Sequence, residues 1–104
     1  MDAVLRALAE PNRRKILSLV RDGEKSAGEI AEAFAISRPA VSQHLKVLEA
    51  AGLVSVRKAG TRRLYKASRE PLAELKAFVD AYWQDGLARL KDAAEAEQRR
   101  LSDG

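Results

Sequence analysis

The fold is decided by the stretch SRPAVSQHLKVLEAAGLV, residues 37–54. Val41, Leu45 and Leu48 recur in it at intervals of four and three residues, so they share one side of an α-helix. The other side begins with short polar groups, whereas a helix face that meets only water normally carries long charged side chains of alternating sign. We therefore expect a helix over residues 38–51 whose polar face contacts another molecule.

A shorter helix is expected immediately before this one. Ser26 and Glu29 form a capping box, in which the serine oxygen accepts from the third amide of the helix and the glutamate reaches back. The helix predicted from this box covers residues 27–34, and Ser37 caps the helix that follows. Two helices joined only by residues 35–37 match a helix-turn-helix. In that motif the second helix presents its N-terminal half to base edges in the major groove.

Two further helices are expected ahead of this pair, over residues 2–9 and 11–21. Pro11 suits the first turn of a helix, because that position needs no amide donor. Gly23 is expected to end the second helix in the left-handed conformation, which glycine adopts without strain.

A hairpin is expected after the helix-turn-helix. Residues 53–58 and 62–67 have the composition of strands, and the intervening residues 59–61, Ala-Gly-Thr, are typical of a hairpin turn. With a closing helix after the hairpin, the fold class is mainly α. Residues 1–98 are expected to form one domain.

The closing helix is expected to start at Pro71 and to cover about residues 71–98, ahead of a polar tail at residues 99–104. Its apolar side chains exceed what a thin four-helix core can cover, so some of them are expected to bury against a partner chain. The alternative is that all of them pack within one chain. With two residues of the first helix added, the candidate dimerisation residues are Val4, Leu5, Leu75, Phe78, Val79, Tyr82, Trp83 and Leu87.

Charge is unevenly distributed along the chain, although its net value is only +4. Residues 1–36 hold six basic and six acidic side chains, residues 37–69 hold eight and one, and residues 70–104 hold five and eight. The three segments therefore carry net charges of 0, +7 and −3. A positive block of this kind is the footprint of a surface that meets a polyanion. Together with the helix-turn-helix pattern, it favours a nucleic-acid partner over a polar face with no partner.

Composition excludes several classes of function. The 104 residues include no cysteine, so disulfides, thiolate metal sites and cysteine nucleophiles are excluded. The single histidine, His44, cannot form a histidine metal cluster, and no catalytic constellation is found, so we expect neither an enzyme nor a cofactor. No apolar run reaches the ~20 residues of a membrane span, and the start MDAVLRALAE lacks the basic and apolar regions of a signal peptide. A cytoplasmic protein without membrane contact is therefore expected.

Three stretches together carry a family resemblance. LAEPNRRKIL, SAGEIAEAFAISRPAVSQHLKVLEAAGLV and RKAGTRRLYKAS resemble the winged helix-turn-helix repressors of the ArsR/SmtB family, over roughly residues 3–98. The resemblance implies a three-helix DNA-binding core, a two-stranded β-wing and flanking N- and C-terminal dimerisation helices. It also implies a homodimer that binds a two-fold symmetric operator in double-stranded DNA and represses transcription.

The resemblance further implies which side chains meet DNA. Arg38, Ser42 and Gln43 are expected at the major groove, where short side chains allow close approach and glutamine can pair with adenine. The amides of residues 38–40 are available for a phosphate. The wing is expected to reach the backbone or the minor groove through basic side chains. The candidate DNA-binding residues, of which the last three lie in the wing, are Arg38, Pro39, Ser42, Gln43, His44, Lys46, Lys58, Arg62 and Arg63.

Two alternatives remain open at this point. By helical phase, His44 neighbours both the apolar side and the polar face of its helix, so it either packs at the edge of the core or contacts DNA directly. The second alternative concerns function: a winged-helix module could bind a protein rather than DNA through the same helix. Steep salt dependence of binding to duplex DNA would separate these two functions.

The sequence departs from the family's metal sensors. Some of these carry paired cysteines on the third helix, where this chain has AGEIAEAF. Others use histidines and carboxylates on the last helix, which here contains no histidine. Asp80, Asp85 and Asp92 remain, but scattered helix carboxylates are usually solvated surface. A member without a recognised metal site is therefore expected, and its inducing signal or partner protein is not written in the sequence.

Overall fold

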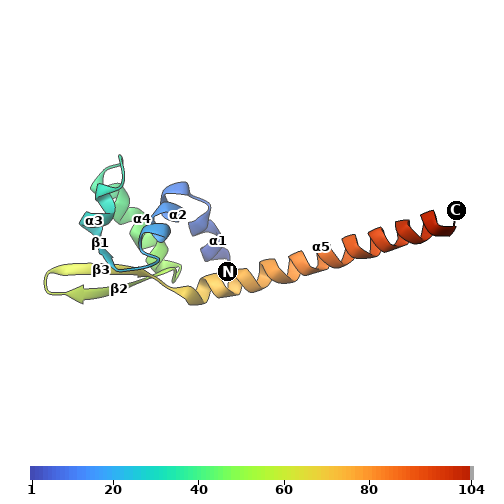
Figure 1. The fold of residues 1–104 in the computed structure, drawn as a ribbon. Coiled ribbons are helices and arrows are strands. Elements are labelled where there is room, and N and C mark those ends of the chain that lie inside the picture. The colour runs from blue at the N-terminus through green and yellow to red at the C-terminus, as the bar shows by residue number, and fades with distance from the viewer. Residues whose placement is uncertain (104) are drawn as a thin grey trace. The chain divides into compact units, whose positions relative to one another are not determined.

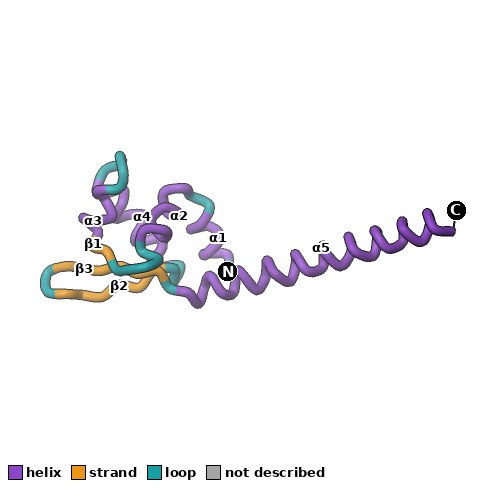
Figure 2. Tube along the Cα trace, viewed as in Figure 1, coloured by secondary structure: helices purple, strands orange, loops and turns teal. Residues whose placement is uncertain are grey.

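The computed structural model describes residues 1–103 and contains five helices and three short strands (Figure 1). Helices dominate, as Figure 2 shows, which confirms the expected mainly α class. The chain divides into two compact units, one covering Met1–Ala73 and the other beginning at Glu74. In chain order the elements are α1 (Asp2–Leu8), α2 (Pro11–Leu19), β1 (Lys25–Ser26), α3 (Ala27–Glu32), α4 (Arg38–Ala50), β2 (Val54–Ala59), β3 (Arg62–Ala67) and α5 (Arg69–Asp103).

Three helices of the first unit, α2, α3 and α4, begin where the sequence provides a side-chain cap. The Glu10 carboxylate accepts a hydrogen bond of 3.0 Å from the amide three residues later, at the start of α2. At α3 the capping box is confirmed, because Ser26 Oγ accepts from the Glu29 amide at 3.2 Å and Glu29 Oε1 accepts from the Ser26 amide at 3.1 Å. Ser37 Oγ accepts at 3.3 Å from the third amide of α4. These caps fix where the two helices of the helix-turn-helix start.

Two helix ends come earlier than expected. α2 ends at Leu19 rather than at residue 21, and Gly23 does not adopt a positive φ. After the helix ends, Val20 is held in place by its fully buried side chain and by its carbonyl, which accepts from the Ala67 amide at the end of β3 at 3.0 Å. α3 ends at Glu32, two residues short of the predicted end.

The inward side of α4 is the one that the sequence predicted. Val41, Leu45 and Leu48 are all buried, at 0%, 2% and 0% exposure. Gly52, with a φ of 74°, terminates the helix as expected. The buried side fixes the rotation of α4, so its polar side is turned to solvent. The rest of the core consists of Val4, Ala7, Ile16, Leu17, Val20, Ile30, Leu53, Val54 and Tyr65.

The sheet contains one strand more than the expected hairpin. β2 and β3 pair antiparallel from Val54↔Ala67 to Ala59↔Arg62, and the two-residue turn between them has Gly60 at a φ of 64°. β1 pairs with the other edge of β3, so the strand order is β1-β3-β2. The expected two-stranded wing is therefore part of a three-stranded sheet. Two residues are too short to show the alternation that reveals a strand.

α5 is longer than predicted at both ends. It starts at Arg69, two residues before Pro71, and continues to Asp103, so residues 99–103 are helical rather than a frayed tail. Alanine, glutamate, glutamine and arginine dominate the end of the chain, and all of them favour helix. The Glu97–Arg100 ion pair adds one stabilising contact there. No helix in residues 1–103 is both long and apolar enough to cross a membrane.

Removing the cap of α4 is expected to lower the free energy of unfolding by about 0.5–2 kcal/mol. In Ser37→Ala the hydrogen bond that the Ala40 amide donates to Oγ is lost, and only water replaces it. Urea denaturation followed by circular dichroism measures the difference. Ser102→Ala, at an exposed position near the end of α5, is the control and is expected to leave stability unchanged. Equal stability of the two variants would contradict the role given to Ser37.

Candidate nucleic-acid interface

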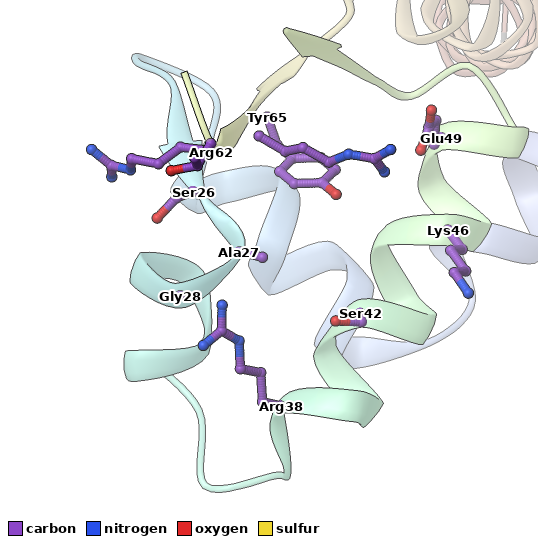
Figure 3. A pocket seen from close by; sticks show the side chains of 11 residues that line it. Ser26, Ala27, Gly28, Arg38, Ser42, Lys46, Glu49, Arg62 and Tyr65 are labelled. Carbon is purple, nitrogen blue, oxygen red and sulfur yellow. The ribbon is translucent and has the colours of Figure 1, made fainter. Parts of the chain in front are cut away.

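A concave surface lies on the first unit between the start of α3, the outward face of α4 and β3 (Figure 3). It encloses about 460 Å³, and we call it the basic concavity, because its wall carries four basic side chains and only one carboxylate. Its lining residues are Ser26, Ala27, Gly28, Arg38, Ser42, Lys46, Glu49, Thr61, Arg62, Arg63 and Tyr65. Five of the nine candidate DNA-binding residues are therefore brought together in one place: Arg38, Ser42, Lys46, Arg62 and Arg63.

Three of the other candidates are exposed but do not line the concavity. Pro39 and Gln43 are exposed on the first two turns of α4, and Lys58 is exposed on β2. Gln43 directly follows Ser42, and Ser42 does line the basic concavity. The start of α4 therefore presents two neighbouring short polar side chains to solvent.

Arg38 turns back from α4 toward α3. Figure 3 shows its guanidinium pointing toward Gly28. A Cβ built on Gly28 would lie 3.6 Å from Arg38 Nη2, so the glycine leaves space beside the guanidinium. In this conformation Arg38 contributes positive charge to the wall of the basic concavity, next to the start of α3.

Two basic side chains of the hairpin are paired with carboxylates. Arg57 donates to both carboxylate oxygens of Glu24, at 3.1 and 2.7 Å, and Arg62 donates to Glu29 Oε1 at 2.5 Å. The hydrogen bond from Arg57 lowers the pKa of Glu24 and raises that of Arg57 itself. Hydrogen bonds from the Ser26 amide and hydroxyl, with the charge of Arg62, lower the pKa of Glu29. Both carboxylates are therefore ionised at neutral pH.

His44 lies outside the basic concavity, and its surroundings favour the packed alternative. Its side chain is 19% exposed, its Nδ1 is 3.4 Å from Arg13 Nη1, and its Nε2 is 3.8 Å from a Glu10 carboxylate oxygen. Arg13 also donates to the carbonyls of Arg6 and Ala7, at 3.0 and 2.7 Å. Arg13, which the sequence analysis did not single out, therefore links the end of α1 to His44 on α4.

The apolar stripe of α5 is open to solvent in the single chain. None of the described residues of α5 is buried, so what covers its apolar side chains stays a prediction. Leu75 is half-buried, and the exposed members are Phe78 at 58%, Val79 at 51%, Tyr82 at 77%, Trp83 at 65%, Leu87 at 48% and Leu90 at 66%.

The two dimerisation candidates of α1 differ in exposure. Val4 is only 6% exposed and belongs to the core of its own chain, because its helix turns that side toward α2 and α4. It is therefore not a surface residue, contrary to expectation. Leu5 is 46% exposed and remains a candidate.

Comparison with known proteins gives one consistent group of relatives. A family model described as "Bacterial regulatory protein, arsR family" matches residues 10–56. The chain is 42% identical over 96 residues to the HTH-type transcriptional regulator Rv2034 of Mycobacterium tuberculosis, a match that covers 92% of this chain and 90% of that protein. It is 45% identical over 60 residues to the transcriptional repressor SdpR of Bacillus subtilis, covering 58% of this chain and 67% of SdpR.

A solved structure gives the same result for the fold. The chain resembles the solution NMR structure of the homodimeric winged helix-turn-helix DNA-binding domain (fragment 1–100) of Mb0332 from Mycobacterium bovis, a possible ArsR-family transcriptional regulator. The TM-score is 0.64 at 34% identity, and the match covers 81% of this chain and 78% of that one. The expected winged helix-turn-helix fold is thereby confirmed.

Proposed function

Because this chain belongs to the ArsR family of bacterial regulatory proteins, we propose that it is a homodimeric repressor that binds a two-fold symmetric operator in double-stranded DNA. The family consists of transcriptional regulators, and we expect no catalytic activity. A repressor acts where the chromosome is, so the proposed location is the cytoplasm. Similarity to the repressor SdpR supports repression, and similarity to the homodimeric domain of Mb0332 supports the dimer.

The observation that carries the proposal is the basic concavity beside the exposed start of α4. Arg38, Lys46 and Arg63 line it, and phosphate contacts of this kind position a protein on duplex DNA. Ser42 and Gln43 lie at the start of α4, where a recognition helix meets base edges. Glutamine pairs bidentately with adenine. We therefore assign sequence readout to the start of α4 and phosphate contacts to the concavity and to Lys58.

Dimerisation is assigned to α5, with Leu5 as a further candidate. A two-fold interface places the same surface of both subunits face to face. An antiparallel pair of α5 helices whose axis passes between residues 82 and 83 matches the apolar stripe with itself. In this register the facing pairs are Tyr82 with Trp83, Phe78 with Leu87, Leu75 with Leu90 and, at the rim, Glu74 with Lys91.

The proposal is tested by selecting fragments of the host genome that the protein binds. The fragment bound most tightly is expected to contain an inverted repeat, and affinity for it is expected to fall steeply with salt. Transcription from the neighbouring promoter is then measured with and without the protein, and repression is expected. A winged-helix module that binds only protein would select no fragment and would show no salt-dependent binding to duplex DNA.

Metal ions are expected to leave operator affinity unchanged. Residues 1–103 contain no group of three or more His, Asp or Glu side chains that could hold a metal ion, and the sequence has no cysteine. Titrations of operator DNA with and without micromolar zinc, cadmium or arsenite check this directly. A loss of affinity of about tenfold or more that a chelator reverses would contradict it, because chelation removes only the metal.

A further inference from the structure

The wing, defined as residues 54–67, carries five basic side chains, of which two are already neutralised within the chain. Arg57 forms its ion pair with Glu24, and Arg62 forms its pair with Glu29. The other three, Lys58, Arg63 and Lys66, form no ion pair within the described residues. The wing therefore offers DNA fewer free charges than its composition suggests.

Glu29 holds Arg62 at a position where DNA phosphate would compete for it. Arg62 lines the basic concavity, and the guanidinium donates to Glu29 Oε1 at 2.5 Å. A guanidinium binds carboxylate and phosphate through the same kind of charge-assisted hydrogen bond, so the two groups exclude each other at one donor. The capping box holds this carboxylate in place, because the same oxygen also accepts from the Ser26 amide at 3.1 Å.

We propose that Glu29 is a specificity-determining residue, which keeps Arg62 bound within the protein and so prevents it from adding a sequence-independent phosphate contact. This inference rests on the proposed DNA-binding function. Arg62 is a positioning residue for the wing: its pair with Glu29 ties the hairpin to α3, and the pair of Arg57 with Glu24 ties it to the segment before β1. Phosphate binding by the wing is then left to its unpaired basic side chains, Lys58, Arg63 and Lys66.

The chemistry of the capping box allows a sharp test. Glutamine at the third helical position completes a capping box as well as glutamate does, so Glu29→Gln removes the charge and keeps the cap. Arg62 is then free to bind a phosphate. The slope of log affinity against log salt is expected to become steeper by about 0.9 per protomer, or by about 2 for a dimer. Binding of a scrambled duplex is expected to tighten more than binding of the operator, so that the ratio between them falls.

Two matched variants distinguish this effect from a general change of charge. Glu32→Gln removes the same charge from the exposed end of the same helix and is expected to leave the slope unchanged. Arg62→Ala alone is also expected to leave the slope of log affinity against log salt unchanged. In the double variant Glu29→Gln/Arg62→Ala, the slope is expected to return to that of the wild type.

Each outcome of these titrations supports or overturns the inference. It is overturned if Glu29→Gln leaves the slope as in the wild type, or if the steeper slope persists when Arg62 is also removed. Should Glu29→Gln unfold, Arg62→Ala decides alone, because a slope that falls by about 2 would show that Arg62 already binds phosphate. Salt-dependent binding by the wild-type protein tests the proposed function separately, so failure of the inference leaves that function standing.

Discussion

Replacing Trp83 and Leu87 by glutamate is expected to give a folded monomer whose affinity for the operator is lower by about 10²- to 10⁴-fold. Both side chains are largely exposed on α5, at 65% and 48%, so their loss leaves the core of the first unit intact. In the proposed register they lie at and beside the two-fold axis, where four added carboxylates in the dimer would repel one another. A monomer loses the advantage of binding two half-sites at once.

Sedimentation and operator titration measure the two parts of this result. The control is Ala81→Glu with Ala88→Glu, which adds the same charge on the opposite side of the same helix, because each turn contains about 3.6 residues. The control is expected to remain dimeric and to bind with only a small electrostatic loss. A Trp83→Glu/Leu87→Glu protein that still sediments as a dimer would contradict the assignment of α5 to the dimer interface.

The second large effect is expected at the start of α4. Gln43→Ala should weaken the free energy of operator binding by about 1–3 kcal/mol per half-site. Gln43 is exposed beside Ser42, at a position suited to a base edge. Its removal is expected to relax the preference at one base position and to leave the salt slope almost intact, because no charge is lost. Operator variants at that base pair measure the change in preference.

Arg63→Ala is the matched comparison for Gln43→Ala. Arg63 lines the basic concavity and has no ion pair within residues 1–103, so it is assigned to a phosphate. Its loss is expected to weaken operator and scrambled duplex alike and to lower the salt slope by up to about 2 across a dimer. If Arg63→Ala lost only operator binding, Arg63 would instead read groove shape, as an arginine in a narrow minor groove does.

The parts of the fold that the sequence predicted are those with a local signal. The side of α4 that carries Val41, Leu45 and Leu48 could be assigned because helical periodicity is visible within a few turns. The caps at Ser26 and Ser37 needed only residues that are close in sequence. The apolar excess of α5 could be recognised by counting its apolar side chains against a small core, but what they pack against stays a prediction.

The parts that escaped prediction depend on contacts between distant residues. Arg62 was assigned to DNA, but its partner Glu29 is 33 residues away and is reached only because β1 pairs with β3. The same holds for Arg13 and His44, which are 31 residues apart. Val4 was assigned to the dimer interface, but it is buried in its own chain, and helical phase alone does not say which side of a short helix meets the core.

The capping box at the start of α3 also bears on how such a regulator can change through mutation. A glutamate codon becomes a glutamine codon by substitution of its first nucleotide, and either residue completes the box. On the role proposed for Glu29, the strength with which the protein holds DNA of any sequence can therefore drift by a single mutational step, without loss of the helix that the box begins. In the proposed arrangement, selection is free to adjust the occupancy of the genome at this position, independently of the sequence readout assigned to α4.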